Sequence, residues 1–169
     1  MPNTFELIAS STVGAGGAAS IDFTSIPSTF TDLVVKLSAR NTQTNANWGD
    51  VQLRPNGATT GFTAKAVFGY SGTTASNTDT NPSGGFTVRN STANTFSNIE
   101  VYIPNYTSSV AKSWSLDAVT EANGVDNAIT WLGANLWSGT ATITSLNLVS
   151  IQGSFAQYST AYLYGVKNA

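Results

Sequence analysis

Apolar and polar residues alternate with a period of two along most of this chain. The clearest run covers residues 32–40, where every second residue from Leu33 to Ala39 is apolar and polar residues such as Lys36 fall mostly between them. Successive side chains of an extended strand point to opposite faces, so this pattern is typical of a strand with one buried face. The segment predicts a central β-strand.

Similar alternation predicts further strands on both sides of this one. Turn chemistry separates them, most clearly in the Gly-rich residues 14–17, at Pro27 and at Pro55-Asn56-Gly57, because Asn and Gly tolerate a positive φ. The expected strands cover residues 4–12, 19–23, 51–53, 62–70, 86–89, 98–103, 114–118, 143–151 and 155–166.

Residues 128–137 are ambiguous by spacing alone. Large apolar residues lie about four positions apart there, as Trp131 and Leu132 do from Leu136 and Trp137, which allows a helical turn. Gly133 and the flanking strands favour an extended chain instead, and no segment carries a capped helical stripe. Roughly ten short strands predict one all-β domain over residues 1–169, an antiparallel β-sandwich or jelly roll.

One stretch lacks any apolar pattern. Residues 71–85 consist almost entirely of Ser, Gly, Thr, Asn and Asp around Pro82, which predicts a long exposed loop and a candidate contact arm. Its candidate partner contacts are Ser71, Asn77, Asp79 and Pro82, together with Phe68 and Tyr70 at the end of the strand before it. The N-terminal segment 1–17 is a second candidate contact segment.

The charge content excludes some partners. Only 9% of the residues are charged, against about a quarter in an average soluble domain. The net charge is −2 and the seven basic residues are scattered, so we expect no nucleic-acid partner. No apolar run approaches the roughly 18 residues that span a bilayer, so we expect no membrane partner. Because Lys36 is the first basic residue, we also expect no charged signal peptide and synthesis in the host cytoplasm.

The residue types leave little chemistry. The chain has no His and no Cys, which removes imidazole and thiolate catalysis and most transition-metal sites. A glycosidase-type carboxylate pair among Asp117, Glu121 and Asp126 remains, although scattered acids that keep the surface hydrated explain these residues more simply. The segment 121–126 could offer oxygens to Ca²⁺, but it lacks the dense Asp alternation of a calcium loop. We therefore expect no catalytic residue, no metal and no cofactor.

Aromatic residues are candidates for a binding platform. Trp114 is in phase with Leu116, and we expect most of the large aromatics to belong to the core. Trp48 stands between Asn47 and Gly49 in what we interpret as a polar loop, so it is a candidate contact residue. A sugar-binding platform is the alternative for the aromatic set: Trp48, Trp114, Trp131, Trp137, Phe68 and Tyr70.

Three stretches carry a family resemblance. They are residues 24–35 (TSIPSTFTDLVV), 99–108 (IEVYIPNYTS) and 155–165 (FAQYSTAYLYG). With them the chain resembles small β-sandwich virion structural proteins of tailed bacteriophages, including phages of cyanobacteria, of the capsid decoration or cement type. Similar chains often carry an acidic residue after the Asn-Gly turn, where this chain has Ala58, which argues against a metal or polar role for that turn.

The resemblance implies a structural function without catalytic residues. It suggests a homotrimer on the exterior of the capsid, at local threefold positions, that binds the major capsid protein and bridges neighbouring subunits. Many weak contacts then add up through avidity. The alternative is a tail-fibre or baseplate domain that binds host-surface glycans through Trp48 and Tyr-rich loops, and a glycan hydrolase ranks third.

Overall fold

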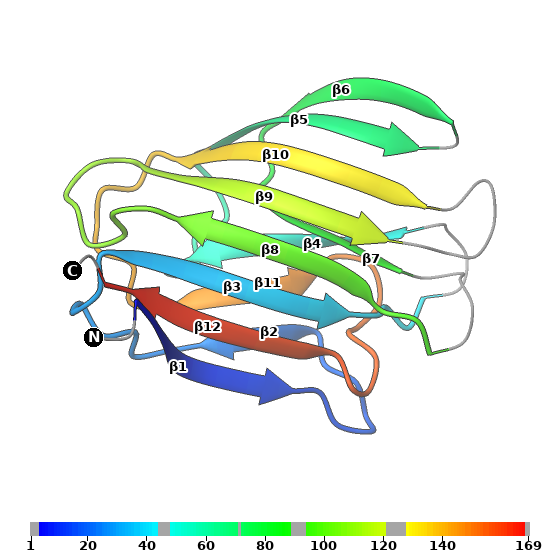
Figure 1. Ribbon diagram of the computed structural model, residues 1–169, viewed down its shortest axis with the longest axis horizontal. Helices are drawn as coiled ribbons and strands as arrows, with labels where there is room; N and C mark the ends of the chain where they lie inside the picture. The colour runs from blue at the N-terminus through cyan, green and yellow to red at the C-terminus, as the bar shows by residue number, and fades with distance from the viewer. Residues whose placement is uncertain (1–3, 44–47, 71, 89–93, 121–127, 168–169) are drawn as a thin grey trace.

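The computed structural model describes residues 4–43, 48–70, 72–88, 94–120 and 128–167. In these residues all secondary structure is β, and every strand pair is antiparallel. Two sheets pack face to face as one antiparallel β-sandwich, with the larger sheet in front of the smaller in Figure 1. The predicted fold class is confirmed.

The larger sheet has eight strands and the smaller sheet has four. The larger sheet has, in spatial order, β1 (Phe5–Thr12), β12 (Thr160–Val166), β3 (Asp32–Ala39), β8 (Ser97–Ile103), β9 (Lys112–Thr120), β10 (Ile129–Trp137), β5 (Phe62–Tyr70) and β6 (Thr73–Asp79). The smaller sheet has β2 (Ser20–Phe23), β11 (Leu146–Ser150), β4 (Trp48–Pro55) and β7 (Ser83–Val88).

The alternating pattern sets which face of the large sheet is buried. In β8, β9 and β10 every second side chain is buried and the others are exposed. In β3 the residues Leu33, Val35, Leu37 and Ala39 point into the core, as predicted. The ambiguous segment 128–137 forms β10 and is extended, also as predicted.

The prediction that residues 71–85 form a long exposed loop is wrong. Residues 73–79 form β6, which pairs with β5 from Thr73 opposite Tyr70 to Asp79 opposite Ala64, and β7 begins at Ser83. The polar composition suggested a loop because β6 is exposed on both faces, and such a strand needs no alternation of apolar and polar residues. Its β-branched Thr residues suit an extended chain, and its backbone pairs the otherwise open edge of β5.

The small sheet covers only part of the large one. Its edge strand β7 packs mainly against β9 and β8 and barely reaches β10. At the other side, connecting segments complete the core: Phe30 lies against Gly165 in β12, and Phe155 bridges Ala18 and Asn41. Beyond β7, no strand of the described chain covers the inner face of β5 and β6.

A buried cation ties two of the connecting segments together. Lys112, at the start of β9, is 1% exposed, and its Nζ donates to the backbone oxygens of Ser108 (2.6 Å), Val110 (2.6 Å) and Thr140 (3.3 Å). Burial lowers the pKa of this ammonium group. The three carbonyls replace the water that the cation loses, so Lys112 holds the segment before β9 against the segment after β10.

Lys112→Met should destabilise the fold while keeping the apolar stem. We expect a loss of about 2 kcal/mol in the free energy of unfolding, because three inward-facing carbonyls lose their donor. Lys36→Met is the control: its ion pair with Glu100 is exposed and should contribute about 0.5 kcal/mol. Urea denaturation measures both, and equal midpoints for the two variants would contradict this role of Lys112.

Candidate functional site

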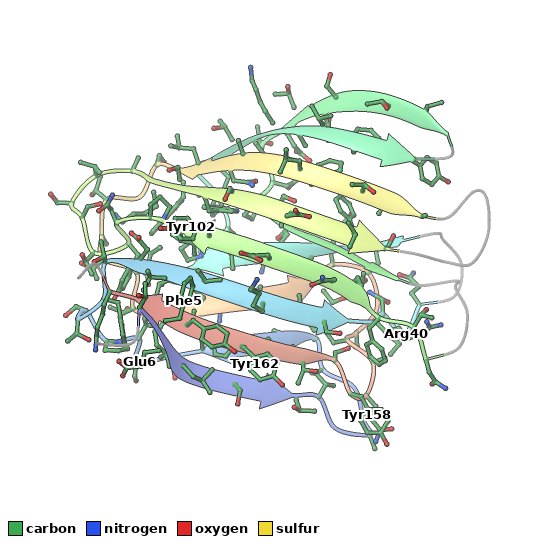
Figure 2. The ribbon with its side chains drawn as sticks, in the orientation of Figure 1. Phe5, Glu6, Arg40, Tyr102, Tyr158 and Tyr162 are labelled. Carbon is green, nitrogen blue, oxygen red and sulfur yellow. The ribbon has the colours of Figure 1, made fainter. Side chains whose placement is uncertain are left out.

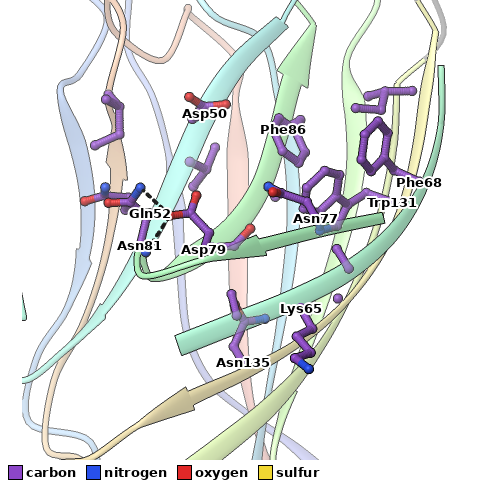
Figure 3. Close-up of a pocket in the computed structure, with 18 residues that line it drawn as sticks. Asp50, Gln52, Lys65, Phe68, Asn77, Asp79, Asn81, Phe86, Trp131 and Asn135 are labelled. Atoms are coloured by element: carbon purple, nitrogen blue, oxygen red, sulfur yellow. Dashed lines mark hydrogen bonds between the residues drawn. The ribbon is translucent and has the colours of Figure 1, made fainter. Parts of the chain in front are cut away.

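A groove of about 430 Å³ opens where the large sheet extends beyond the small one. Its walls come from β5 and β6 on one side and from β4 and β7 on the other, with inner-face residues of β10 between them (Figure 3). The groove exists because small residues occupy the inward positions here: Ala64 and Ala66 on β5 and Gly133 on β10. Larger side chains at these positions would fill it.

Three aromatic rings form one end of the groove. Trp131 of β10 stacks on Phe68 of β5, with centroids 5.0 Å apart and planes at 20°, and it meets Phe86 of β7 at 4.6 Å and 57°. The cluster therefore joins the two sheets. Figure 3 shows these three rings close together at one end of the groove.

Carboxylate and amide groups line the rim. The Oδ1 of Asp79 accepts hydrogen bonds from the backbone N–H groups of Thr80 (2.6 Å) and Asn81 (3.1 Å) and from Asn81 Nδ2 (2.9 Å) (Figure 3). Across the groove, Asp50 accepts from Gln152 Nε2 at 2.8 Å. Local hydrogen bonds thus hold both carboxylates, one on each wall.

Two polar side chains in the groove lack a partner within the described chain. Asn135 is 5% exposed, and neither its Nδ2 nor its Oδ1 has a hydrogen-bond partner. The Nε1 of the buried Trp131 has none either. A buried polar group without a partner costs about 1–3 kcal/mol, so native proteins have few of them.

The structure brings together three of the predicted contact residues. Phe68, Asn77 and Asp79 all line the groove. Phe68 comes from β5, a predicted strand, whereas Asn77 and Asp79 come from β6 and not from the predicted loop. Pro82 is buried, and its carbonyl accepts from the backbone N–H of Leu53 at 2.9 Å. Tyr70 ends β5 between Thr73 and Ile129.

The other predicted site residues either lie away from the groove or fall outside the described residues. Trp48 is the first residue of β4, paired with Val88, so the polar loop predicted around it is wrong at this residue. Asp117 lies on the outer face of β9, opposite Glu100 and Leu132. Ser71, Glu121 and Asp126 lie outside the described residues, as does the segment 121–126 considered for Ca²⁺.

Sequence reasoning missed the residues that define the groove. Asn135 had a readable signal, since it is the one polar residue among the inward positions of β10: Ile129, Trp131, Gly133, Asn135 and Trp137. Asp50 and Gln52 had none, because their position depends on how β4 packs. In the described ranges no three His, Cys, Asp or Glu residues cluster in a way that could hold a metal ion, and no helix there is long and apolar enough to cross a membrane.

A second surface is the outer face of the large sheet. Two groups of exposed apolar side chains lie on it, separated by the Lys36–Glu100 ion pair; Figure 2 shows Phe5, Tyr102 and Tyr162 of the first group on the face turned to the viewer. We call the first group the aromatic patch: Phe5, Leu7, Tyr102 and Tyr162. We call the second group the aliphatic patch: Val67, Val119, Leu132 and Leu136.

Hydrogen bonds hold one member of the aromatic patch in place. The hydroxyl of Tyr102 donates to Oδ2 of the buried Asp32 (2.6 Å), whose Oδ1 accepts from the backbone N–H of Asn105 (2.8 Å). The hydrogen bond to Asp32, burial and the charge of Asp32 together raise the pKa of the Tyr102 phenol above its ordinary value of 10.0.

This shift predicts a loss of stability at alkaline pH. The folded chain holds the Tyr102 proton more tightly than the unfolded chain, so the associated stability is present below pH 10.0 and is lost as the pH rises through the folded pKa. Tyr102→Phe should flatten the fall in the free energy of unfolding above that pH, measured by urea denaturation. Tyr162→Phe, whose hydroxyl has no carboxylate partner in the described chain, is the control; identical pH profiles for both variants would contradict the linkage.

No protein-family model, curated protein or solved structure matches this chain.

Proposed function

We propose that the chain is a virion structural protein of a tailed bacteriophage, a decoration protein that binds the outer surface of the head shell. Its partner is then the major capsid protein, and each copy bridges neighbouring subunits. The resemblance of residues 24–35, 99–108 and 155–165 supports the phage assignment. The observation that carries a docking role is the outer face of the large sheet, which exposes the aromatic and aliphatic patches.

These patches suit a contact with another protein. Leu132 is 62% exposed and Val67, directly opposite it on the neighbouring strand, is 55% exposed. Exposed apolar clusters of this kind mark interaction surfaces, since burying them in a contact is favourable by about 25 cal/mol per Å². The low charge also lets many copies sit close together with little repulsion.

The edges of the large sheet supply a further assembly contact. The β1 edge is disrupted by a register shift between Leu7 and Ala9 and carries the ion pair of Glu6 with Lys167 (2.7 Å). Natural proteins protect edges in such ways against strand addition. The β6 edge has no Lys, no Pro and an unbroken register. It can therefore pair with a strand of a neighbouring copy or of the shell, consistent with the homotrimer that the resemblance implies.

A tail-fibre or baseplate domain that binds host-surface glycans is the second candidate. The groove favours it, because its aromatic end and amide rim are of the kind that ligand sites use. Copy number separates the two functions: hundreds of copies per particle, measured by gel densitometry of purified virions, indicate the shell, and a handful or tens indicate the tail.

Leu132→Ser tests the docking face. Burying a Leu side chain contributes about 1.5–3 kcal/mol, so the variant should bind particles that lack the protein at least about tenfold more weakly. Its fold should persist, because the side chain is exposed. Binding is measured by co-sedimentation with such particles.

Val110→Ser is the matched control for that experiment. Val110 is also exposed and apolar, but it lies in the segment before β9 and not on the face of the sheet. It should bind as the parent chain does. Unchanged occupancy of Leu132→Ser, or an equal loss for both variants, would count against docking through the aliphatic patch.

A further inference from the structure

One row of residues crosses the outer face of the large sheet and joins the aromatic patch to the aliphatic patch. The strand registers place its members opposite one another on neighbouring strands, in the order Tyr162, Lys36, Glu100, Asp117, Leu132 and Val67. Neighbouring strands are about 4.8 Å apart, so the three charged residues lie directly between the two patches. A partner that covers both patches therefore covers these charges as well.

The charged part of this row has one negative charge in excess. Lys36 pairs with Glu100, and their side chains are 48% and 46% exposed. Asp117 is exposed directly opposite Glu100, and its carboxylate has no ion pair or hydrogen bond with any described residue. Lys65 lies two strands away on β5, opposite Ala134, and does not pair with it. Like charges directly opposite on neighbouring strands destabilise a sheet, so this arrangement gives the isolated chain no advantage.

A hollow lies beside the two carboxylates on the same face. It has a volume of about 300 Å³, and Tyr102 lines it from β8. Tyr102 is two residues from Glu100 along β8, and Ser115 is two residues from Asp117 along β9, so about 6.8 Å separates the hollow from the carboxylates. Small outward side chains on β9 and β10 form its floor: Ser113, Ser115 and Ala134.

These features restrict the chemistry that a partner can bring to this place. A contact that buries Glu100 and Asp117 without a further cation would leave a carboxylate unpaired and out of water, which is strongly unfavourable. Apolar or acidic partner side chains cannot compensate this charge. Arginine suits the place best, because its planar guanidinium has five donors that can bind two carboxylates, and its apolar stem can lie in an uncharged hollow.

We propose that the docking partner inserts an arginine side chain between the two apolar patches. The stem lies in the hollow over Ser115, and the guanidinium binds Asp117 and Glu100. This inference rests on the proposed docking function and deepens it, because it names the chemistry of the partner surface. The apolar patches then supply most of the buried area, and the arginine fixes the position of the partner on the sheet, as charged groups across an interface do.

Charge variants test this contact by co-sedimentation with particles that lack the protein. Asp117→Asn removes the charge at nearly constant shape and should weaken binding at least about tenfold, whereas Asp117→Glu keeps the charge and should bind within about threefold of the parent chain. Asp22→Asn is the matched control, because Asp22 is exposed on β2 in the small sheet. Equal binding by Asp117→Asn and Asp22→Asn would overturn the arginine contact.

The stability of the isolated chain separates this role from a structural one. Asp117→Asn removes one of two carboxylates that lie opposite each other, so the midpoint of urea denaturation should stay equal or rise. A lower midpoint would assign Asp117 to the support of the fold and would count against the proposal.

An NMR titration of the isolated ¹⁵N-labelled chain tests the contact without particles. The probes are the blocked tripeptide leucine-arginine-leucine and the same peptide with citrulline, which has the shape of arginine but no charge. The arginine peptide should shift the backbone N–H signals of Ser115 and Asp117, and the citrulline peptide should bind at least about threefold more weakly. Equal titrations, or no shift with either peptide, would overturn the proposal.

The two experiments distinguish the failure of this inference from the failure of the docking function. A parent chain that binds particles as tightly as Asp117→Asn does would leave the docking function intact and refute the arginine contact. A parent chain that does not bind particles, while the arginine peptide still shifts Ser115 and Asp117, would refute the docking function and leave the cation contact standing.

Discussion

The structure depends on a mismatch in width between two sheets that must bury each other's apolar faces. At about 4.8 Å between neighbouring strands, eight strands span about 34 Å and four span about 14 Å. The small sheet therefore covers the centre of the large one, where Leu33, Val101 and Leu116 lie fully buried. At the β1 side, segments that carry Phe30 and Phe155 complete the covering. At the β6 side nothing in the described chain does so, and the groove follows from that difference.

The uncovered side explains features of the sequence that a uniform core would not produce. Inward positions that elsewhere carry Leu, Ile or Val carry Ala66 and Gly133 beside the groove, and Asn135 replaces an apolar residue at an inward position of β10. Departures from local rules of this kind tend to occur at functional sites, because selection for stability alone would remove them. The Asn135 amide and the Trp131 indole depart furthest from these rules, since neither has a hydrogen-bond partner among the described residues and each lowers the stability of the isolated fold.

Sequence reasoning succeeded where one face of a strand is buried and failed where neither is. β3, β8 and β9 alternate because each has a core side and a solvent side, so their existence could be predicted. β6 has solvent on both sides, and its Ser, Thr and Asn residues gave the signal of a loop. The groove could not be predicted for a different reason. It depends on long-range pairing, such as Gly133 opposite Ala66, and on which strand of the small sheet lies last over the large one, and local periodicity indicates neither.

The aliphatic patch and the groove lie on opposite faces of the same strands. On β5, Val67 points outward and Ala66 inward; on β10, Leu132 points outward and Gly133 inward. Because neighbouring residues of a strand project to opposite sides, a partner docked on the outer face leaves the groove on the far side of the sheet. A copy held on a shell by its aliphatic patch would therefore present its groove away from that contact.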